Sequence, residues 1–281
     1  MTAFWRAPAG LHPASARLPD EGELPSFDGA TGWLNSAPLT PAGLRGKVVL
    51  VNFWTYTCIN WLRQLPYVRT WPALYLADAQ GRIRHHHFGE GEYAQSEMVI
   101  QQLLAGAGST GAGTDMVSVD PSGLEVPADW ASLRSPENYT GYERTEGFAS
   151  PGGVVPGKPH VYTVPARLGL NQWALSGDWI MEEGATTLNA VNGQIACRFH
   201  ARDLNLVMGP AAPGSPVRCR VLIDGQPPGQ AHGTDTGGDG NGTVTYQRVY
   251  QLIRQPGPIT DRTFEITFPD TGAQAYSFTF G

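Results

Sequence analysis

Residues 47–66 read KVVLVNFWTYTCINWLRQLP, and this stretch decides the fold of the first half of the chain. The run Val48–Trp54 is apolar except for Asn52, which is the pattern of a strand covered on both faces within an α/β sheet. Ile59–Arg69 has apolar residues at helical spacing and is predicted to be a helix. Cys58 is therefore expected in the first helical turn, where unpaired backbone N–H groups and the helix dipole favour a thiolate. The sequence predicts a reactive thiol.

The order of strand, aromatic pair, threonine, cysteine and helix resembles the thioredoxin superfamily, especially redoxins with the motif FW-x-x-x-C-x-x-C. This pattern is matched in two further places: Phe53-Trp54 stands before the cysteine, and Pro66 follows it by eight residues. The position of the second cysteine holds Trp61, so the motif keeps one thiol. One thiol cannot close an intramolecular disulfide, and its redox cycle must pass through a sulfenic acid, a mixed disulfide or a second chain.

Thr55 and Pro72 complete the predicted catalytic group. Thr55 stands three residues before Cys58, as in the Thr-x-x-Cys pattern of peroxiredoxins, and it can also cap the helix. Pro72 matches the position at which thioredoxin-like proteins hold a cis-proline beside the cysteine, and a trans proline that opens a strand is the alternative. A helix from Cys58 to Thr70 rises about 18 Å. Pro72 therefore reaches the thiol only if this helix ends earlier.

The composition predicts a globular chain that is long enough for two domains. It has 281 residues, of which 41% are hydrophobic, and its 35 glycines and 23 prolines favour many turns and an all-β portion. The net charge of −6 does not favour binding to nucleic acid or to an anionic membrane, because both partners are negatively charged. The sequence shows no apolar run of membrane-spanning length and no signal-peptide core. We therefore expect a soluble cytoplasmic protein, with export by another route left open.

The chain is expected to have four parts: an irregular lead-in over 1–40, a thioredoxin-like domain over 41–110, a linker over 111–158 and a β-sandwich over 159–281. After the Cys58 helix, the first domain should contain two strands joined by a hairpin turn and then a helix, at Ala73–Ala77, Ile83–Phe88 and Tyr93–Ala105. From residue 159 onward apolar and polar residues alternate over about eight strands. The predicted fold class is a truncated α/β thioredoxin-like domain followed by an all-β jelly-roll sandwich.

Several phrases resemble the soluble C-terminal part of DipZ-type redoxins: GKVVLVNFWTYTCINW, WPALYLADAQGRIRHHHFGEGEY, SPENYTGYER, RFHARDLNLVMGP and AYSFTFG. The resemblance implies a thioredoxin-like domain followed by a sandwich that looks like a carbohydrate-binding module. Relatives place a further strand and helix before the WPALYL strand, whereas here Thr70 is bonded directly to Trp71. The first domain is therefore expected to be internally shortened.

Two strand arrangements are open for the shortened domain. Ala73–Ala77 can lie parallel beside Val48–Trp54 as a short βαβ unit. Alternatively the family order survives, and Val48–Trp54 lies at the edge of the sheet with unpaired backbone groups. We favour the second arrangement and predict self-association to a homo-oligomer through this edge.

The sandwich offers aromatic and polar side chains for a ligand such as a carbohydrate, and the candidates are Trp173, Trp179, Arg198, His200 and Arg220. A place in the core is the alternative for the tryptophans. Cys197 and Cys219 lie on the apolar phase of their strands and are predicted to be buried thiols, with a disulfide as the alternative. Neighbouring residues of His85–His87 point to opposite faces, so at most two converge. We predict no metal site and no cofactor.

Three functional hypotheses follow. The first is a thiol-dependent redoxin, in which the Cys58 thiolate attacks a disulfide or peroxide substrate and an external thiol reductant restores it. The second is a non-catalytic carbohydrate-binding protein that carries a degenerate thioredoxin-like domain. The third is a folded but inactive relict. None of the three involves nucleic acid or a membrane span.

Overall fold

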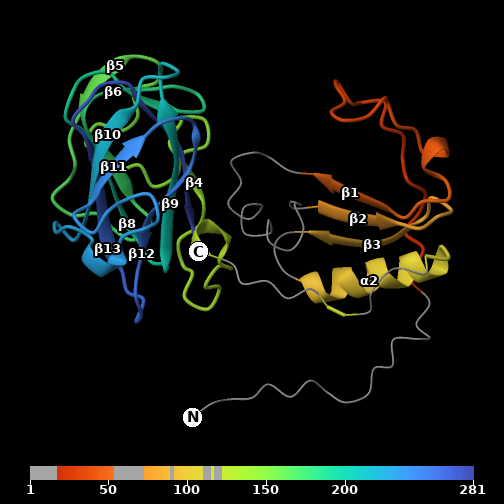
Figure 1. Ribbon diagram of the computed structural model, residues 1–281. Coiled ribbons are helices and arrows are strands. Elements are labelled where there is room, and N and C mark those ends of the chain that lie inside the picture. Colours follow the sequence, from red (N-terminus) through yellow and green to blue (C-terminus); the bar gives the residue numbers. More distant parts are fainter. Residues whose placement is uncertain (1–17, 54–72, 89–91, 110–114, 117–121) are drawn as a thin grey trace, which may run out of the picture. The chain divides into compact units, whose positions relative to one another are not determined.

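The computed structural model describes residues 18–53, 73–88, 92–109, 115–116 and 122–281. The chain divides into two compact units (Figure 1). The described residues up to 116 belong to the first unit, and residues 122–281 belong to the second. No helix in these described ranges combines the length and apolar character that a membrane crossing needs.

The described part of the first unit is a three-stranded antiparallel sheet with one helix against it (Figure 1). A short 3-10 turn, η1 (Ala42–Leu44), precedes the sheet, and the strands follow in the order β1 (Val49–Phe53), β2 (Ala73–Ala77) and β3 (Ile83–Phe88). Helix α2 (Tyr93–Gly106) packs Val99 and Leu103 against Leu76 of β2. The predicted strands at 73–77 and 83–88 and the helix after them are confirmed.

The pairing of β1 decides between the two arrangements left open for this unit. β1 runs antiparallel to β2, with Phe53 opposite Ala73 and Val49 opposite Ala77. The parallel βαβ alternative is therefore wrong, and the other order is found, with β1 at the edge of the sheet in the described residues. The β2–β3 connection forms because Asp78 Oδ1 accepts hydrogen bonds from the backbone N–H groups of Gln80 and Arg82.

Over residues 122–281, the described part of the second unit, the chain forms eleven strands and two 3-10 turns, η2 (Gly123–Glu125) and η3 (Gly229–Ala231). The strands are β4 (Asn138–Tyr139), β5 (Pro159–Tyr162), β6 (Trp173–Met181), β7 (Thr186–Leu188), β8 (Gly193–Phe199), β9 (Asp203–Pro210), β10 (Val217–Ile223), β11 (Asn241–Val244), β12 (Arg248–Arg254), β13 (Arg262–Phe268) and β14 (Ala273–Phe280).

These strands form two antiparallel layers that share β6. One layer has the order β11-β10-β13-β8-β6, and the other continues as β6-β7-β14-β9-β12, with β5 on β6 and β4 on β14. Gly177 has a φ of 94°, which glycine adopts at little cost, and β6 changes partners at this point. Residues 173–176 pair with β8, while residues 177–181 pair with β5 and β7. The sandwich expectation is met, and the jelly-roll topology stays a prediction.

The core of this unit lies between the two layers. It is formed by the inward residues of the alternating strands, including Ile195 and Phe199 of β8, Phe264 of β13, and Leu206 of β9. Full burial of each such side chain contributes about 1.5–3 kcal/mol. The period-two pattern therefore predicted which side chains face inward.

The described part of the expected linker, residues 122–158, packs on the sandwich. Thr140 donates a buried 2.7 Å hydrogen bond from Oγ1 to the Ala275 carbonyl, and its own carbonyl accepts one from Thr186. Leu124 packs beside Val207 and Val249 on the outer side of the second layer. The Pro- and Gly-rich composition resembles a linker, but buried backbone groups need partners, and the sandwich supplies them.

Candidate functional site

The predicted catalytic residues Thr55, Cys58, Trp61 and Pro72 lie outside the described residues, in the interval 54–72. The two strand ends that flank this interval are described. Phe53 and Ala73 are direct cross-strand partners. Cys58 follows Phe53 by five positions, and Pro72 is bonded to Ala73. The interval 54–72 therefore begins and ends at the same end of the sheet.

An aromatic face borders that end of the sheet, formed by Phe53, Tyr75, His86 and Phe88. The Tyr75 ring stacks on His86 with centroids 5.9 Å apart and meets Phe53 and Phe88 edge-on at 6.1 and 6.0 Å. Phe53 is 57% exposed and Phe88 is 62% exposed. A cavity of about 560 Å³ extends from Phe53 and Tyr75 to the segment at Leu24. This face offers exposed apolar surface at the end of the sheet where β1 ends and β2 begins.

The three neighbouring histidines separate as the strand pattern predicts. His86 lies on the aromatic face, with Nδ1 2.7 Å from Glu21 Oε2. His85 and His87 share the other face, where His85 Nε2 lies 3.4 Å from Ser96 Oγ of α2. Burial lowers the pKa of His85. Among the described residues, no three His, Cys, Asp or Glu side chains gather as metal ligands would.

Cys197 and Cys219 are buried thiols and form no disulfide, which confirms the prediction for them. Burial raises the pKa of Cys219 to about 12, and burial also raises the pKa of Cys197. Both sulfurs are therefore thiols at neutral pH and lack the thiolate character that a nucleophile needs.

Trp173 and Trp179 belong to the sandwich core. They are 1% and 0% exposed, and both indole N–H groups already donate hydrogen bonds, to Glu146 O and to Ser176 O. A ring without an exposed face cannot stack on a ligand, so the ligand-binding role predicted for these two side chains is wrong. The physical reason is that both residues fall on the inward phase of β6.

Arg198 and His200 converge on a residue that the sequence analysis missed. Asp261, just before β13, lies 2.6 Å from His200 Nδ1 and 3.4 Å from Arg198 Nη2. The hydrogen bond from His200 lowers the pKa of Asp261. The backbone N–H of His200 also donates to Ser135 Oγ. No sequence signal links Asp261 to these residues, because the register of β8 and β13 brings them together.

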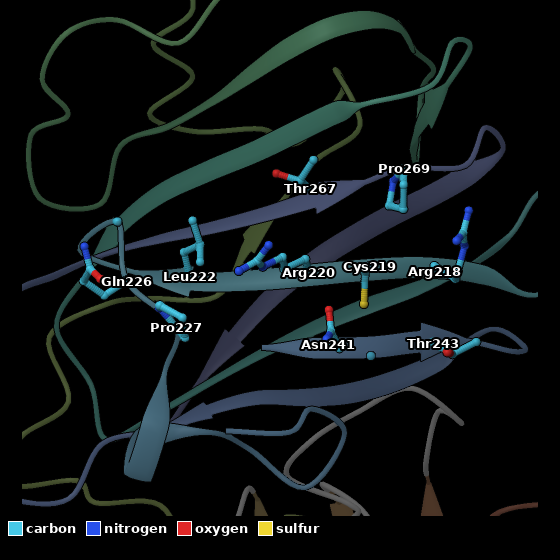
Figure 2. A pocket seen from close by; sticks show the side chains of 12 residues that line it. Arg218, Cys219, Arg220, Leu222, Gln226, Pro227, Asn241, Thr243, Thr267 and Pro269 are labelled. Atoms are coloured by element: carbon cyan, nitrogen blue, oxygen red, sulfur yellow. The ribbon is translucent and has the colours of Figure 1, made fainter. Parts of the chain in front are cut away.

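Arg220 lies elsewhere, on the outer face of the layer formed by β10, β11 and β13. It borders a cavity of about 900 Å³, and Figure 2 shows its side chain among those that line this cavity. Asn241 and Thr267 stand opposite Arg220 on the neighbouring strands. The alternation of β10 predicted that Arg220 is exposed, but it did not indicate its neighbours.

Comparison with known proteins gives a family match over the second unit. The family model described as "Thioredoxin like C-terminal domain" matches residues 135–281, which is more than half of the chain. The chain is 28% identical over 330 aligned residues to the protein DipZ of Mycobacterium bovis and, equally, to that of Mycobacterium tuberculosis. These alignments cover 95% of this chain and 44% of each relative. The chain thus spans less than half the length of these curated relatives.

Two further likenesses are more limited. A 44-residue stretch, 15% of this chain, is 50% identical to 4% of the Arabidopsis thaliana protein SUPPRESSOR OF QUENCHING 1, chloroplastic. A family two carbohydrate esterase from Cellvibrio japonicus matches with a TM-score of 0.26 and 13% identity, over 34% of this chain and 26% of that one. That TM-score is too low to bear on the fold.

The DipZ alignment is longer than this chain. It is 330 positions long, while 95% of this 281-residue chain is about 267 residues, so about 60 aligned positions have no counterpart here. The chain is shorter than its relatives over the aligned region.

Proposed function

The chain belongs to the family of the thioredoxin-like C-terminal domain, and from this premise we propose that it is a thiol-dependent redoxin whose reacting group is Cys58. The observation that carries the proposal is the pairing of Phe53 with Ala73. This pairing brings together the described residues on either side of the interval 54–72, which is compatible with the redoxin arrangement of a cysteine beside a proline. The DipZ likeness over 95% of the chain supports the same chemistry.

The proposed cycle uses one protein thiol. The Cys58 thiolate attacks a disulfide, one S–S bond forms as the substrate S–S bond breaks, and the departing sulfur takes a proton. An external thiol then attacks the mixed disulfide, releases Cys58 and is oxidised itself. With a peroxide, the O–O bond breaks and Cys58 becomes a sulfenic acid, which the same external thiol reduces in two steps. Trp61 at the second motif position makes the external thiol necessary.

Alkylation tests this proposal without knowledge of the substrate. We expect Cys58 to react with iodoacetamide at least tenfold faster than Cys197 or Cys219 at pH 7, because burial keeps the latter two protonated and covered. Mass spectrometry of peptides from the native chain at several pH values gives the three rates. After denaturation the three rates should converge. Equal rates in the native chain would contradict a reactive Cys58.

We also propose a ligand-binding role for the sandwich, with carbohydrate as the ligand class. The supporting observation is the 900 Å³ cavity that Arg220 borders. Its volume lies within the usual range of ligand sites, about 300–1,000 Å³. The alternative of a non-catalytic carbohydrate-binding protein shares this site and differs in predicting an unreactive Cys58.

Self-association through β1 is a further expected property. In the described part of the first unit β1 pairs with β2 alone, and Leu50 and Phe53 on β1 are 39% and 57% exposed. Such an edge can accept a strand from a second copy. Sedimentation velocity should show mass increasing with concentration, and Leu50→Lys should reduce this association. Val191→Lys, at a 56% exposed position of the second unit, is the control. A monomer at every concentration would refute this expectation.

A further inference from the structure

The cavity on the outer face of β10, β11 and β13 is built from a row of polar side chains across three strands (Figure 2). Arg220 is at the centre of the row, with Asn241 opposite on β11 and Thr267 opposite on β13. Two residues before it on β10, Arg218 stands opposite Thr243. Side chains from adjacent strands are thus presented side by side on one face, as cross-strand partners are.

Two arginines line the cavity, and among the described residues Arg218 forms an ion pair whereas Arg220 does not. Arg218 forms a two-pronged pair with Asp270, with N–O distances of 2.6 and 2.9 Å, and this contact lowers the pKa of Asp270 to about 2. The nearby carboxylate of Asp239 accepts hydrogen bonds from the backbone and side chain of Asn241. Arg220 is exposed and takes part in none of the ion pairs formed by the described residues. The hydrogen bonds from Asn241 and, as a smaller contribution, the charge of Arg220 lower the pKa of Asp239. A guanidinium without a direct ion-pair partner among the described residues therefore borders the cavity, in a chain of net charge −6.

The remaining lining also restricts the ligand. The ends and walls of the cavity carry Leu222, Pro227 and Pro269 together with Gln226, and no aromatic ring is among the lining residues that the structure describes. A neutral sugar is usually held by stacking on an aromatic ring, and this surface has none to offer. The hydroxyls of Thr243 and Thr267 and the side-chain oxygen of Asn241 suit a ligand that has hydroxyl groups.

We propose that this cavity binds an acidic saccharide, with the carboxylate of a uronic acid residue on the guanidinium of Arg220 and the sugar hydroxyls on Thr243 and Thr267. Arginine matches a carboxylate because its planar fork donates two parallel hydrogen bonds. The inference rests on the proposal that the sandwich binds a carbohydrate. It adds the charge of the ligand and the side chain that recognises this charge.

Titration of the full chain with three probes tests the inference: trigalacturonic acid, its methyl ester and inorganic sulfate. The ester keeps every ring hydroxyl and removes the charge. We expect the acid to bind at least tenfold more tightly than the ester, and sulfate to bind more weakly than the acid. Amide resonances of residues 217–223 and 241–244 should shift during the NMR titration with the acid.

Matched variants locate the site. Arg220→Gln should weaken binding of the acid at least tenfold and leave the ester unaffected, because it removes one charge and keeps hydrogen-bonding capacity. Arg167→Gln removes one charge at an exposed position outside the cavity and should change neither affinity. Arg218→Gln should have a smaller effect than Arg220→Gln, since Asp270 already neutralises Arg218. Unchanged thermal unfolding of the variants shows that they fold.

Three outcomes would overturn the inference. In the first, the acid and the ester bind with equal affinity and Arg220→Gln changes neither affinity. The sandwich would then bind a neutral carbohydrate, so the carbohydrate proposal would hold and the acidic ligand would be wrong. In the second, sulfate binds with the same affinity as the acid. The site would then recognise an anion and not a saccharide. Failure of the acid and the ester to bind would overturn the ligand role as well. The alkylation of Cys58 is measured separately, so none of these outcomes bears on the redox proposal.

Discussion

Cys58→Ser is expected to reduce the disulfide-exchange and peroxide-reduction activity of the chain to the rate of the external thiol alone. A serine hydroxyl stays protonated at neutral pH and forms no sulfur–sulfur bond, so both branches of the proposed cycle lose their first step. The measurement is consumption of a chromogenic disulfide and of hydrogen peroxide in the presence of an external thiol, for the parent chain and for the variant.

Cys197→Ala is the matched control for this loss. Cys197 lies buried in the sandwich core, so its removal takes away one thiol and leaves the proposed reacting group in place. Its activity should equal that of the parent chain. Activity retained in Cys58→Ser, or lost in Cys197→Ala with the fold intact, would contradict the assignment of the chemistry to Cys58.

Asp203→Ala is expected to lower the free energy of unfolding of the second unit by about 3–5 kcal/mol. The Asp203 side chain is 1% exposed and accepts hydrogen bonds from Arg254 at 2.7 and 3.0 Å and from Arg202 at 2.7 Å. These arginines in turn donate to the carbonyls of Gly123 and Pro127. Removal of the carboxylate leaves two guanidinium groups without their shared partner and loosens the 122–128 segment.

Urea unfolding followed by tryptophan fluorescence measures this effect, because both Trp173 and Trp179 lie in the core of the same unit. Arg218→Gln is the control: it breaks an exposed ion pair on the same unit and should leave the urea midpoint unchanged. A midpoint for Asp203→Ala equal to that of the control would show that the buried carboxylate contributes little to the stability of this unit.

The local elements were predictable from the sequence because local rules determine them. The alternation of Val217–Ile223 and Phe264–Phe268 predicted the strands and their inward side chains. The hairpin at 78–81 followed from its turn residues. Burial of Cys197 and Cys219 followed from the apolar phase of their strands. In each case the deciding interactions are made within a few residues or by a single buried face.

By itself, the sequence determined that one cysteine follows an apolar run, that a tryptophan, Trp61, stands three residues after it, and that alternating strands make up the second half of the chain. The tertiary structure alone decided that β1 pairs antiparallel with β2, that Asp261 joins Arg198 and His200, and that Arg220 stands between Asn241 and Thr267. These outcomes depend on register and on contacts between residues far apart in the chain. A period-two pattern shows which face a side chain occupies, whereas strand pairing determines which neighbours it has on that face.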